Sequence, residues 1–483
     1  MVCRRARTRV MNELWRFASH RKVMELNELD PELRECVRDG DGVADHYGGR
    51  TPFTFVDQRG DEILLLERLA DGRVEAGTAY NMTCGYGTGI LGDDIRHLAS
   101  GFTGFLDRAT TTNDEFHSVE RHHLVSRVKR LIASHTDTRE TDWELTFTST
   151  GSEAMDLALQ LVLLDGFHLA SGVDARRERD VVIACHGAWH GWVLGTNQML
   201  DRRQFTDGLP RLANGQVVFM QYGNLDDLQA VFSAYRGRIR AAVVEGILGD
   251  GGVVRASDAW WEMLFGLCAK EDVRLIDDEV LTGFRTGAML ALPRGRAPDC
   301  VTLGKALGFG LFPISAVAWR RPPLSLRAGV GVRTFNARPF QASVVDACLE
   351  HVEHHALFAR SAELGERAIR ELMEIARRYP SVFKAVRGQG LLIGIELADS
   401  LARQGRRIRD ELLRNGVLTE IESGIFSRKL PRSARVNETL RLTPPLTVSE
   451  SSLADAIQRI ATYASRLAEQ SNSHGLATMA DNA

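Results

Sequence analysis

Hydrophobic residues fall in short continuous runs through the middle of the chain, between residues 143 and 319. These runs are rich in β-branched residues, and stretches with helical spacing separate them. A strand that is buried on both faces is apolar at nearly every position, whereas a half-exposed strand alternates. We therefore predict seven buried strands, at 143–148, 180–185, 216–221, 241–246, 273–278, 300–303 and 314–319.

Helical stretches alternate with these strands, at 153–164, 225–235 and 258–270, and Ser257 is a suitable N-cap for the last of them. Strand–helix alternation predicts an α/β fold, with a mostly parallel seven-stranded sheet and helices on both faces. Ligands bind such sheets at the carboxyl ends of the strands. The residues just after each strand are therefore the candidates for chemistry.

The pattern changes along the chain and predicts four segments. Residues 1–100 are irregular and glycine-rich, and we expect them to contribute to a smaller domain and to the rim of the site. Residues 101–335 carry the alternation and predict the large domain. Residues 336–468 predict a smaller α+β domain, with helices over 339–355, 359–378 and 449–467 and an alternating strand over 390–397. The polar tail over 469–483 is predicted to be disordered.

The composition is that of a globular protein, 44% hydrophobic, with a net charge of −3 from 60 basic and 63 acidic residues. This balance offers no basic surface for nucleic acid, and no apolar run is long enough to cross a membrane. The seven cysteines are scattered, without a Cys-x-x-Cys pair, which is typical of free thiols in a reducing compartment. With no secretory signal in residues 1–16, we expect a cytoplasmic protein.

Only six of the basic residues are lysines: Lys22, Lys129, Lys270, Lys305, Lys384 and Lys429. Lys305 directly follows the 300–303 strand, in the sequence Leu-Gly-Lys-Ala-Leu-Gly. Burial among apolar neighbours lowers the pKa of a lysine and frees its amine as a nucleophile. The alternative is a lysine in a surface loop.

Two further strand ends carry candidate residues. Asp278 closes the 273–278 strand, where a buried carboxylate needs a cation or a function; the alternative is an acid solvated in a loop. The turn over 148–154 contains Gly151 and Ser152 at the start of a helix, where free N–H groups and the helix dipole can hold a phosphate. An ordinary capping turn is the alternative here.

An aromatic and an ion pair complete the candidates. Trp189 follows the 180–185 strand between glycines and could lie flat on a planar ligand, although a core tryptophan is the commoner outcome. Arg441 lies in an apolar, proline-stiffened stretch and needs an anion, and Asp250 lies in a glycine-rich acidic loop. His186 and His190 are separated by glycine and lack an adjoining glutamate, so we predict no metal site.

A lysine, an acid, an anion site and an aromatic, each after a different strand, are the parts of a pyridoxal phosphate (PLP) site. The chain resembles the class III aminotransferases of fold type I, a family that includes the glutamate-1-semialdehyde aminomutase branch, over roughly residues 45–465. The most specific matches are Asp-Glu-Val-Leu-Thr-Gly-Phe-Arg at 278–285, Pro-Asp-Cys-Val-Thr-Leu-Gly-Lys-Ala-Leu at 298–307, and Leu-Arg-Leu-Thr-Pro-Pro-Leu at 440–446.

The resemblance implies a role for each residue around the cofactor. Lys305 forms the Schiff base with PLP and moves protons. Asp278 pairs with the pyridine nitrogen, and Gly151 and Ser152 bind the phosphate. Trp189 takes the place of the Tyr or Phe that stacks on the ring.

The resemblance also implies the partners. Thr334 matches a threonine that reaches the phosphate of a second subunit, so a homodimer with composite sites is expected. Arg441 matches an arginine that binds a substrate carboxylate, and Asp250 an acid that pairs with it. The implied reaction is a ping-pong transfer of an amino group between a small-molecule amino donor and an oxo-acid acceptor.

Departures from the family pattern lie around the cofactor and the substrate. Leu281 replaces a common glutamine, Gly246 and Leu248 replace a proline and a glutamine, and Arg338 replaces an asparagine. Another PLP reaction therefore stays open, namely an aminomutase, a decarboxylase or a carbon–carbon bond-forming enzyme. A non-catalytic relative is a further alternative, against which the retention of Lys305, Asp278 and the phosphate turn argues. The donor and acceptor, and the role of the insertion at 166–179, do not follow from the sequence.

Overall fold

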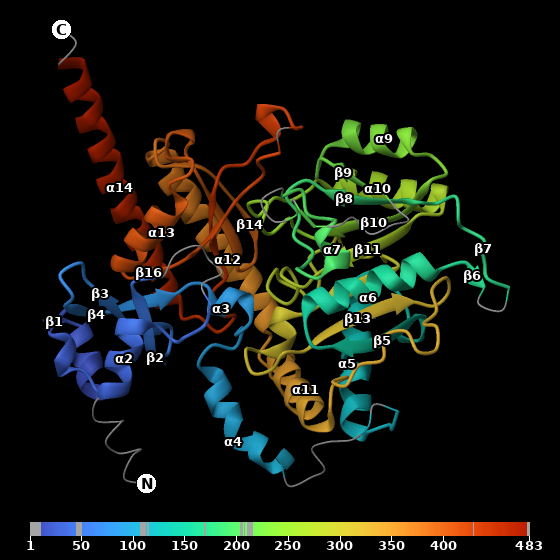
Figure 1. The fold of residues 1–483 in the computed structure, drawn as a ribbon, viewed down its shortest axis with the longest axis horizontal. Helices are drawn as coiled ribbons and strands as arrows, with labels where there is room; N and C mark the ends of the chain where they lie inside the picture. The colour runs from blue at the N-terminus through green and yellow to red at the C-terminus, as the bar shows by residue number, and fades with distance from the viewer. Residues whose placement is uncertain are drawn as a thin grey trace. The chain divides into compact units, whose positions relative to one another are not determined.

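The computed structural model describes residues 11–44, 51–106, 113, 115–168, 171–202, 206, 208–209, 216–427 and 429–480. The chain forms two compact units (Figure 1). Unit 1 comprises the described residues of Met1–Met82, Arg406–Thr419 and Val448–Ala483, and unit 2 those of Thr83–Gly405 and Glu420–Thr447. The four predicted segments group the chain differently and stay a prediction.

All seven predicted strands form, and they make one sheet in unit 2 with the order β5-β13-β12-β11-β10-β8-β9. Their bounds are β5 (Trp143–Thr148), β8 (Val181–Cys185), β9 (Gln216–Met220), β10 (Ile239–Glu245), β11 (Arg274–Asp278), β12 (Cys300–Leu303) and β13 (Ser315–Arg320). Within this sheet β13 is antiparallel to both of its neighbours, and the other pairs are parallel. The predicted α/β fold with a mostly parallel sheet is confirmed.

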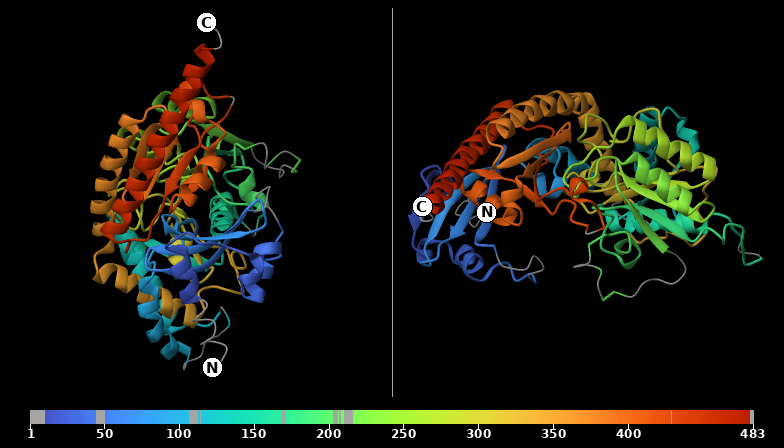
Figure 2. Two further views of the ribbon diagram at one scale, coloured as in Figure 1. Left: turned by 90° about the vertical axis from the view of Figure 1, so that its left-hand side faces the viewer. Right: turned by 90° about the horizontal axis from the view of Figure 1, so that it is seen from above.

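Helices cover this sheet (Figures 1 and 2). Every residue of β8 and β10 is buried, which explains why these strands read as unbroken apolar runs. The helices that pack around the sheet are α5 (Val119–Thr136), α6 (Gly151–Leu164), α9 (Leu225–Ala234) and α10 (Asp258–Glu271). Leu157 of α6 shares a core cluster with Val243 and Val317 of the sheet. Ser257 caps α10 as predicted, since its side chain accepts a hydrogen bond from the N–H of Trp260.

A second, antiparallel sheet in unit 2 has the order β14-β15-β18-β17. Its strands are β14 (Phe383–Gln389), β15 (Leu392–Leu397), β18 (Thr439–Leu442) and β17 (Glu420–Glu422). The predicted alternation of β15 is wrong, because all six of its residues are buried. Helix α12 (Leu357–Arg378) packs against β15. A Cβ on Gly394 would lie 2.8 Å from the Cβ of Val253, so the strand is also packed closely at that residue.

The remaining elements of unit 2 connect the strands of its sheets. They are α3 (Cys84–Gly87), α4 (Asp94–Leu106), β6 (Phe167–His168), β7 (Val173–Asp174), α7 (Leu194–Asn197) and α11 (Pro339–His354), with short 3-10 turns at Glu140–Asp142, Lys305–Gly308, Asp399–Leu401 and Arg432–Ala434. The insertion at 166–179 thus contains the small hairpin of β6 and β7, of which residues 169 and 170 lie outside the described part.

Unit 1 is built on a sheet with the order β1-β4-β3-β2, to which β16 adds by pairing with β4. Its elements are β1 (Val23–Met24), a 3-10 turn (Leu26–Glu28), α2 (Pro31–Asp39), β2 (Phe53–Arg59), β3 (Glu62–Arg68), β4 (Val74–Asn81), α13 (Gly405–Arg414), β16 (Val417–Leu418) and α14 (Glu450–Ala480). The backbone of α14 is helical to Ala480, where we predicted a helix ending at 467 and a disordered tail.

Six of the seven cysteines lie in the described part of the chain, and all six are free thiols. Five of them are buried, as predicted, and Cys36 is half-buried. Cys3 lies outside the described residues. No helix among the described residues has the length and apolar character needed to cross a membrane.

Candidate functional site

The carboxyl edge of the large sheet brings the predicted lysine and acid close together in the fold. Asp278, the last residue of β11, is paired in register with Glu245 of β10 and Thr302 of β12. Lys305 follows β12 after one intervening glycine and begins a 3-10 turn, with a positive φ of 38°. Their strands are neighbours, so both residues lie at this edge of the sheet.

Asp278 is buried and held by three hydrogen bonds. One carboxylate oxygen accepts from His190 Nδ1 at 2.8 Å, and the other accepts from Thr302 Oγ1 at 3.2 Å and from the N–H of Val280 at 3.1 Å. Burial lowers the pKa of His190, but the hydrogen bond and the negative charge of Asp278 outweigh it and raise that pKa. The carboxylate therefore has a fixed orientation in a dry site.

The two neighbouring acids are arranged differently. Glu279 accepts hydrogen bonds from the N–H groups of Ala291 and Leu292, at 2.5 and 3.0 Å, and from the hydroxyl of Thr282. Asp277 points to the opposite face of β11, because successive side chains of a strand alternate. Burial, followed by the charge of Glu279, raises the pKa of Asp277 well above its ordinary value. Asp278 is therefore the acid of this group placed to hold a ligand cation.

The turn before α6, where an anion site is predicted, forms a capping box. The hydroxyl of Thr150 accepts from the N–H of Glu153 at 3.3 Å, and the Glu153 carboxylate accepts from the N–H groups of Ser149 and Thr150. This capping box uses some of the free N–H groups of the helix start. Those of Gly151 and Ser152, which have no partner within the helix, stay available for an anion.

Glycines bring this turn against the lysine loop. A Cβ on Gly151 would lie 2.5 Å from Cγ1 of Val280, and a Cβ on Gly304 would lie 3.4 Å from the Cα of Gly151. A Cβ on Gly304 would also lie 2.8 Å from Oγ of Ser315, so both positions are too closely packed for a side chain to enter without a shift. The residue before Lys305 thus touches the anion site, and this juxtaposition fits a ligand that carries a phosphate at one end and a group for the lysine at the other.

Trp189 lies beside a buried glutamate. The backbone N–H of Trp189 donates to Glu245 Oε1 at 3.0 Å, and the other carboxylate oxygen accepts from the backbone N–H of Gly249 at 2.9 Å. Burial raises the pKa of Glu245 to about 7. The Trp189 ring packs edge-on against Trp192, with 4.7 Å between centroids, and under the guanidinium of Arg202 at 5.3 Å. The stacking role implied for Trp189 stays a prediction.

Arg441 and Asp250 are joined directly, at 3.1 Å between Nη1 and Oδ1. Two more acids hold the same guanidinium: Nε and Nη2 contact Glu420 at 2.7 Å, and Nη2 contacts Glu422 at 2.9 Å. Burial raises the pKa of Glu422 well above its ordinary value. Three acidic side chains therefore surround one buried cation. The second oxygen of Glu420 is buried without a hydrogen-bond partner among the described residues.

Thr334 lies apart from this group. Its side chain is exposed, and its carbonyl accepts a hydrogen bond from Arg338 at 3.2 Å. None of the contacts described for the residues around Asp278 involves it. The contact of Thr334 with the phosphate of a second subunit stays a prediction.

Sequence reasoning missed four residues of the site: His190, Arg202, Glu420 and Glu422. His190 was considered only as a metal ligand, and its actual partner is 88 positions away. Glu420 and Glu422 are two positions apart on a short strand beside Arg441, so they share a face with each other. That spacing, next to an arginine in need of an anion, was the available signal.

Comparisons with known proteins agree with this geometry. A family model described as class-III aminotransferase matches residues 74–463. The ornithine aminotransferase described as mitochondrial from Oryza sativa subsp. japonica is 30% identical over 311 residues, which are 64% of this chain and 63% of that protein. The chain thus matches less than two thirds of the length of this relative.

Solved structures share the fold. The ornithine aminotransferase from Toxoplasma gondii ME49 has a TM-score of 0.74 at 22% identity, covering 92% of this chain and 97% of that one. An amine transaminase from an uncultivated Pseudomonas species, in its PLP-bound form, has a TM-score of 0.71 at 21% identity, covering 89% and 97%. At these identities the likeness concerns the fold alone.

Proposed function

The chain belongs to the class III aminotransferase family, and we propose that it moves an amino group between an amino compound and an oxo acid in a ping-pong reaction. Membership of this family confirms the predicted fold class and the predicted cofactor, PLP. The observation that carries the proposal is the fixed, buried Asp278 beside the strand that leads to Lys305, with the anion site of Gly151 against the same loop.

Each residue has a distinct task in this proposal. When bound, PLP supplies a ring that accepts electrons from the substrate carbon. Asp278 keeps a proton on the ring nitrogen, because its charge favours the cationic form there. The N–H groups of Gly151 and Ser152 hold the phosphate at the positive end of α6. Lys305 Nζ anchors the cofactor in the resting enzyme and then carries a proton to and from the substrate carbon.

A screen of amino donors, with 2-oxoglutarate and pyruvate as acceptors, tests the proposed reaction. We expect at least one donor to form a new amino acid from one of these acceptors. The relatives named ornithine aminotransferase make ornithine a necessary member of the screen. Release of carbon dioxide, or an internal shift of the amino group without any acceptor, would identify another PLP reaction instead.

We propose that Arg441 binds the acceptor carboxylate and that Asp250 pairs with Arg441 when the donor has no carboxylate there. An unpaired buried charge costs several kcal/mol, roughly 3–5. The direct 3.1 Å contact supports the pair, and Glu420 and Glu422 keep the guanidinium in one orientation. The ion pair of Arg441 and Asp250 would open when an oxo acid binds, and it would form again when the donor binds.

Arg441→Ala is expected to raise the acceptor KM by about 10–100-fold, because a charge-assisted contact is lost. The same change leaves buried acids without their cation and should lower the melting temperature. Asp250→Ala is the cleaner companion, since Arg441 then keeps Glu420 and Glu422. It should slow the donor half-reaction more than the acceptor half-reaction. Steady-state kinetics with thermal melts check both variants, and a loss of stability with unchanged acceptor kinetics would mean that Arg441 only ties the strands together.

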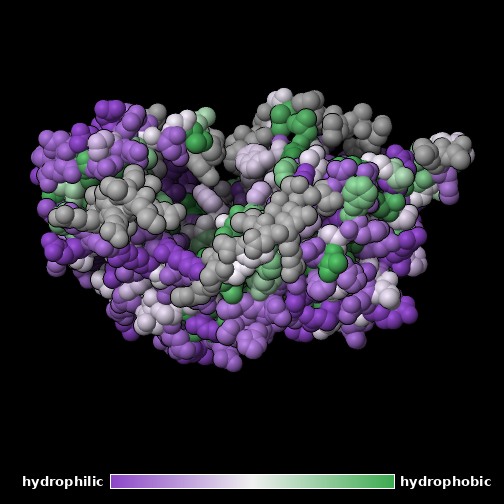
Figure 3. Space-filling model, turned by 90° about the horizontal axis from the view of Figure 1, so that it is seen from below, coloured by the Kyte–Doolittle hydropathy of each residue, from purple (hydrophilic) through white to green (hydrophobic). Residues whose placement is uncertain are grey.

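We propose a homodimer in which Thr334 reaches the phosphate of the partner's cofactor. The surface near Thr334 supports this, because Val332, Phe335, Phe116 and Val119 are each more than half exposed. Figure 3 shows hydrophobic side chains in patches among hydrophilic ones on the face seen from below. Exposed apolar side chains of this kind mark a protein–protein contact.

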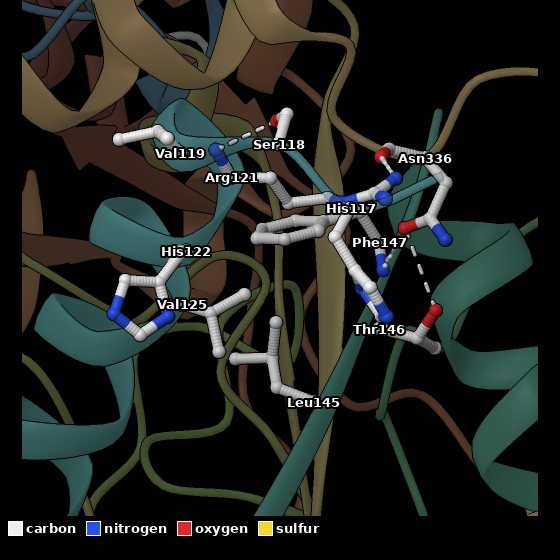
Figure 4. Close-up of a pocket in the computed structure, with 10 residues that line it drawn as sticks. All are labelled: His117, Ser118, Val119, Arg121, His122, Val125, Leu145, Thr146, Phe147 and Asn336. Carbon is white, nitrogen blue, oxygen red and sulfur yellow. Dashed lines mark hydrogen bonds between the residues drawn. The ribbon is translucent and has the colours of Figure 1, made fainter. Parts of the chain in front are cut away.

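A cavity of 540 Å³ lies beside the same segment (Figure 4). Asn336 closes one side of it. Its side-chain Oδ1 accepts from the backbone N–H of Phe147 at 2.9 Å, and its backbone carbonyl accepts from Arg121 Nη1 at 3.3 Å. These bonds fix the chain two residues beyond Thr334 to β5 and α5. A second copy of the chain is the occupant that we propose for this surface.

Dimerisation and cofactor retention should therefore change together. Thr334→Ala is expected to weaken cofactor binding by about tenfold while leaving the dimer intact, since one phosphate hydrogen bond is lost. Val332→Asp together with Phe335→Asp should give monomers that lose the cofactor. Sedimentation measured alongside absorbance of the cofactor checks this, and a monomer with full cofactor occupancy at micromolar concentration would contradict it.

We also propose a cytoplasmic location. The free thiols of the six described cysteines support a reducing compartment. Location of a tagged protein in cell fractions tests this.

A further inference from the structure

Asp250 is shared between two arginines. Its Oδ1 lies 3.1 Å from Arg441 Nη1, and its Oδ2 lies 3.7 Å from Arg202 Nη2. Its side chain is 20% exposed, against 3% for Arg441 and 8% for Arg202, so it is the member of the three that a ligand reaches most easily. One carboxylate oxygen of Asp250 is thus in direct contact with Arg441, and the other is only loosely paired with Arg202.

Arg441 does not depend on Asp250 for its orientation. Glu420 and Glu422 hold Nε and Nη2, at 2.7 to 2.9 Å, from the neighbouring strand. If Asp250 moved away, the guanidinium would stay neutralised and fixed by these two acids. The Nη1 edge is therefore the part of Arg441 that can exchange one carboxylate for another.

Arg202 is the opposite case, because among the described residues no carboxylate is in close contact with its buried guanidinium: Asp250 lies 3.7 Å away, and Glu422 acts on it only through its charge. Within the described chain its guanidinium contacts the carbonyl of Gly187 at 3.3 Å, the hydroxyl of Ser423 at 3.4 Å and, loosely, the carboxylate of Asp250. Its guanidinium also lies over the ring of Trp189. A buried charge is stabilised when a carboxylate comes into full contact. Arg202 would therefore gain if Asp250 moved toward it.

This pair of arginines lies near the reacting lysine. Burial works to raise the pKa of Asp250, but the positive charges of the two arginines and of Lys305 outweigh it and lower that pKa. The amine of Lys305 is thus near enough for its charge to act on Asp250. Asp250 follows β10 and Lys305 follows β12, so both leave the same carboxyl edge of the sheet, with β11 between their strands.

We propose that Arg202 is a positioning residue, which receives Asp250 when the carboxylate of an oxo-acid acceptor takes its place on Arg441. The inference rests on the proposed function. With the acceptor bound, the substrate pairs with Arg441 and Asp250 pairs with Arg202, so no carboxylate is left without a cation. With a donor that lacks this carboxylate, Asp250 returns to Arg441. Arg202 thereby lowers the cost of admitting an acid to the site without touching it.

Arg202→Gln tests this, because glutamine keeps a hydrogen-bond donor for Gly187 and Ser423 and removes the charge. We expect the acceptor KM of the holoenzyme to rise by about tenfold and the donor half-reaction to change less. Arg202→Lys, which keeps the charge, should recover most of the loss. Arg238→Gln removes an exposed arginine that pairs with Asp180 at 2.7 Å and serves as the matched control, with unchanged kinetics.

A double-mutant cycle separates a positioning role from the alternatives. In an Asp250→Ala background there is no acid to receive, so Arg202→Gln should change the acceptor KM by less than about twofold. Binding of glutarate, an unreactive dicarboxylate, measured by calorimetry should follow the same pattern. An equal effect in both backgrounds would mean that Arg202 contacts the substrate itself, and a lower melting temperature with an unchanged KM would mean a structural role; either result overturns the proposal. If the unaltered enzyme transfers no amino group at all, the proposed function fails instead.

Discussion

Lys305→Ala is expected to lower turnover by at least about 10⁴-fold. The lysine has two tasks in the proposed reaction, as covalent anchor of the cofactor and as the base that moves a proton at the substrate carbon. No neighbouring group can replace both. In the loop after β12 the backbone of Lys305 has a positive φ and its neighbour Gly304 lies against the anion site, so the position of the amine is built into the fold. Turnover with the best donor measures the loss.

Borohydride reduction followed by peptide mapping supports the same measurement. In the unaltered protein the cofactor should be fixed on one peptide, that of Lys305, and with six lysines in the chain the mapping is unambiguous. Lys384→Ala is the matched control, since Lys384 makes a surface pair with Asp399 at 3.0 Å and should keep full turnover. Label on any other lysine would show that the assignment of Lys305 is wrong.

Asp278→Asn is expected to keep the cofactor and to lower turnover by about 10³-fold. The amide has the same shape and can still accept from Thr302 and Val280, but it lacks the charge that keeps a proton on the ring nitrogen. The substrate carbon then loses the electron-accepting ring that makes its proton removable. Cofactor absorbance and turnover, measured on the same sample, separate loss of binding from loss of chemistry.

Asp277→Asn is the matched control for this change. Asp277 is the adjacent acid on the same strand and is equally buried, but it points to the other face of the sheet. Burial raises its pKa, so it is expected to be neutral already and the variant should turn over normally. Normal turnover in Asp278→Asn with a defect in Asp277→Asn would reverse the two assignments.

The sequence was sufficient for features that depend on neighbours along the chain. The bounds of the strand at 300–303 were predicted to the residue, because the strand is a short apolar run that ends at a glycine. The choice of Lys305 as the candidate lysine followed from its position just after this strand. The small residues before α6 indicated a turn at a helix start, either an anion site or an ordinary capping turn, and the structure shows the capping box there. These features depend on local spacing and on burial, both of which the sequence reveals.

Features that depend on contacts between distant segments could not be predicted in the same way. The bond between His190 and Asp278 depends on β8 and β11 ending at one edge of the sheet, with β10 between them. Glu420 and Glu422 meet Arg441 only through the register of β17 on β18. The full burial of β15 depends on what covers its two faces, which its own residues do not specify.

The central claim, that the net reaction is transfer of an amino group, is tested most directly by following the cofactor through one cycle. The holoenzyme is mixed with an amino donor alone, and its absorbance should change completely from that of the aldehyde form of the cofactor to that of the amine form. Addition of an oxo acid should then restore the first spectrum and yield one equivalent of the new amino acid. A spectrum that does not change with any donor, or that changes and is not restored by any oxo acid, would contradict the account.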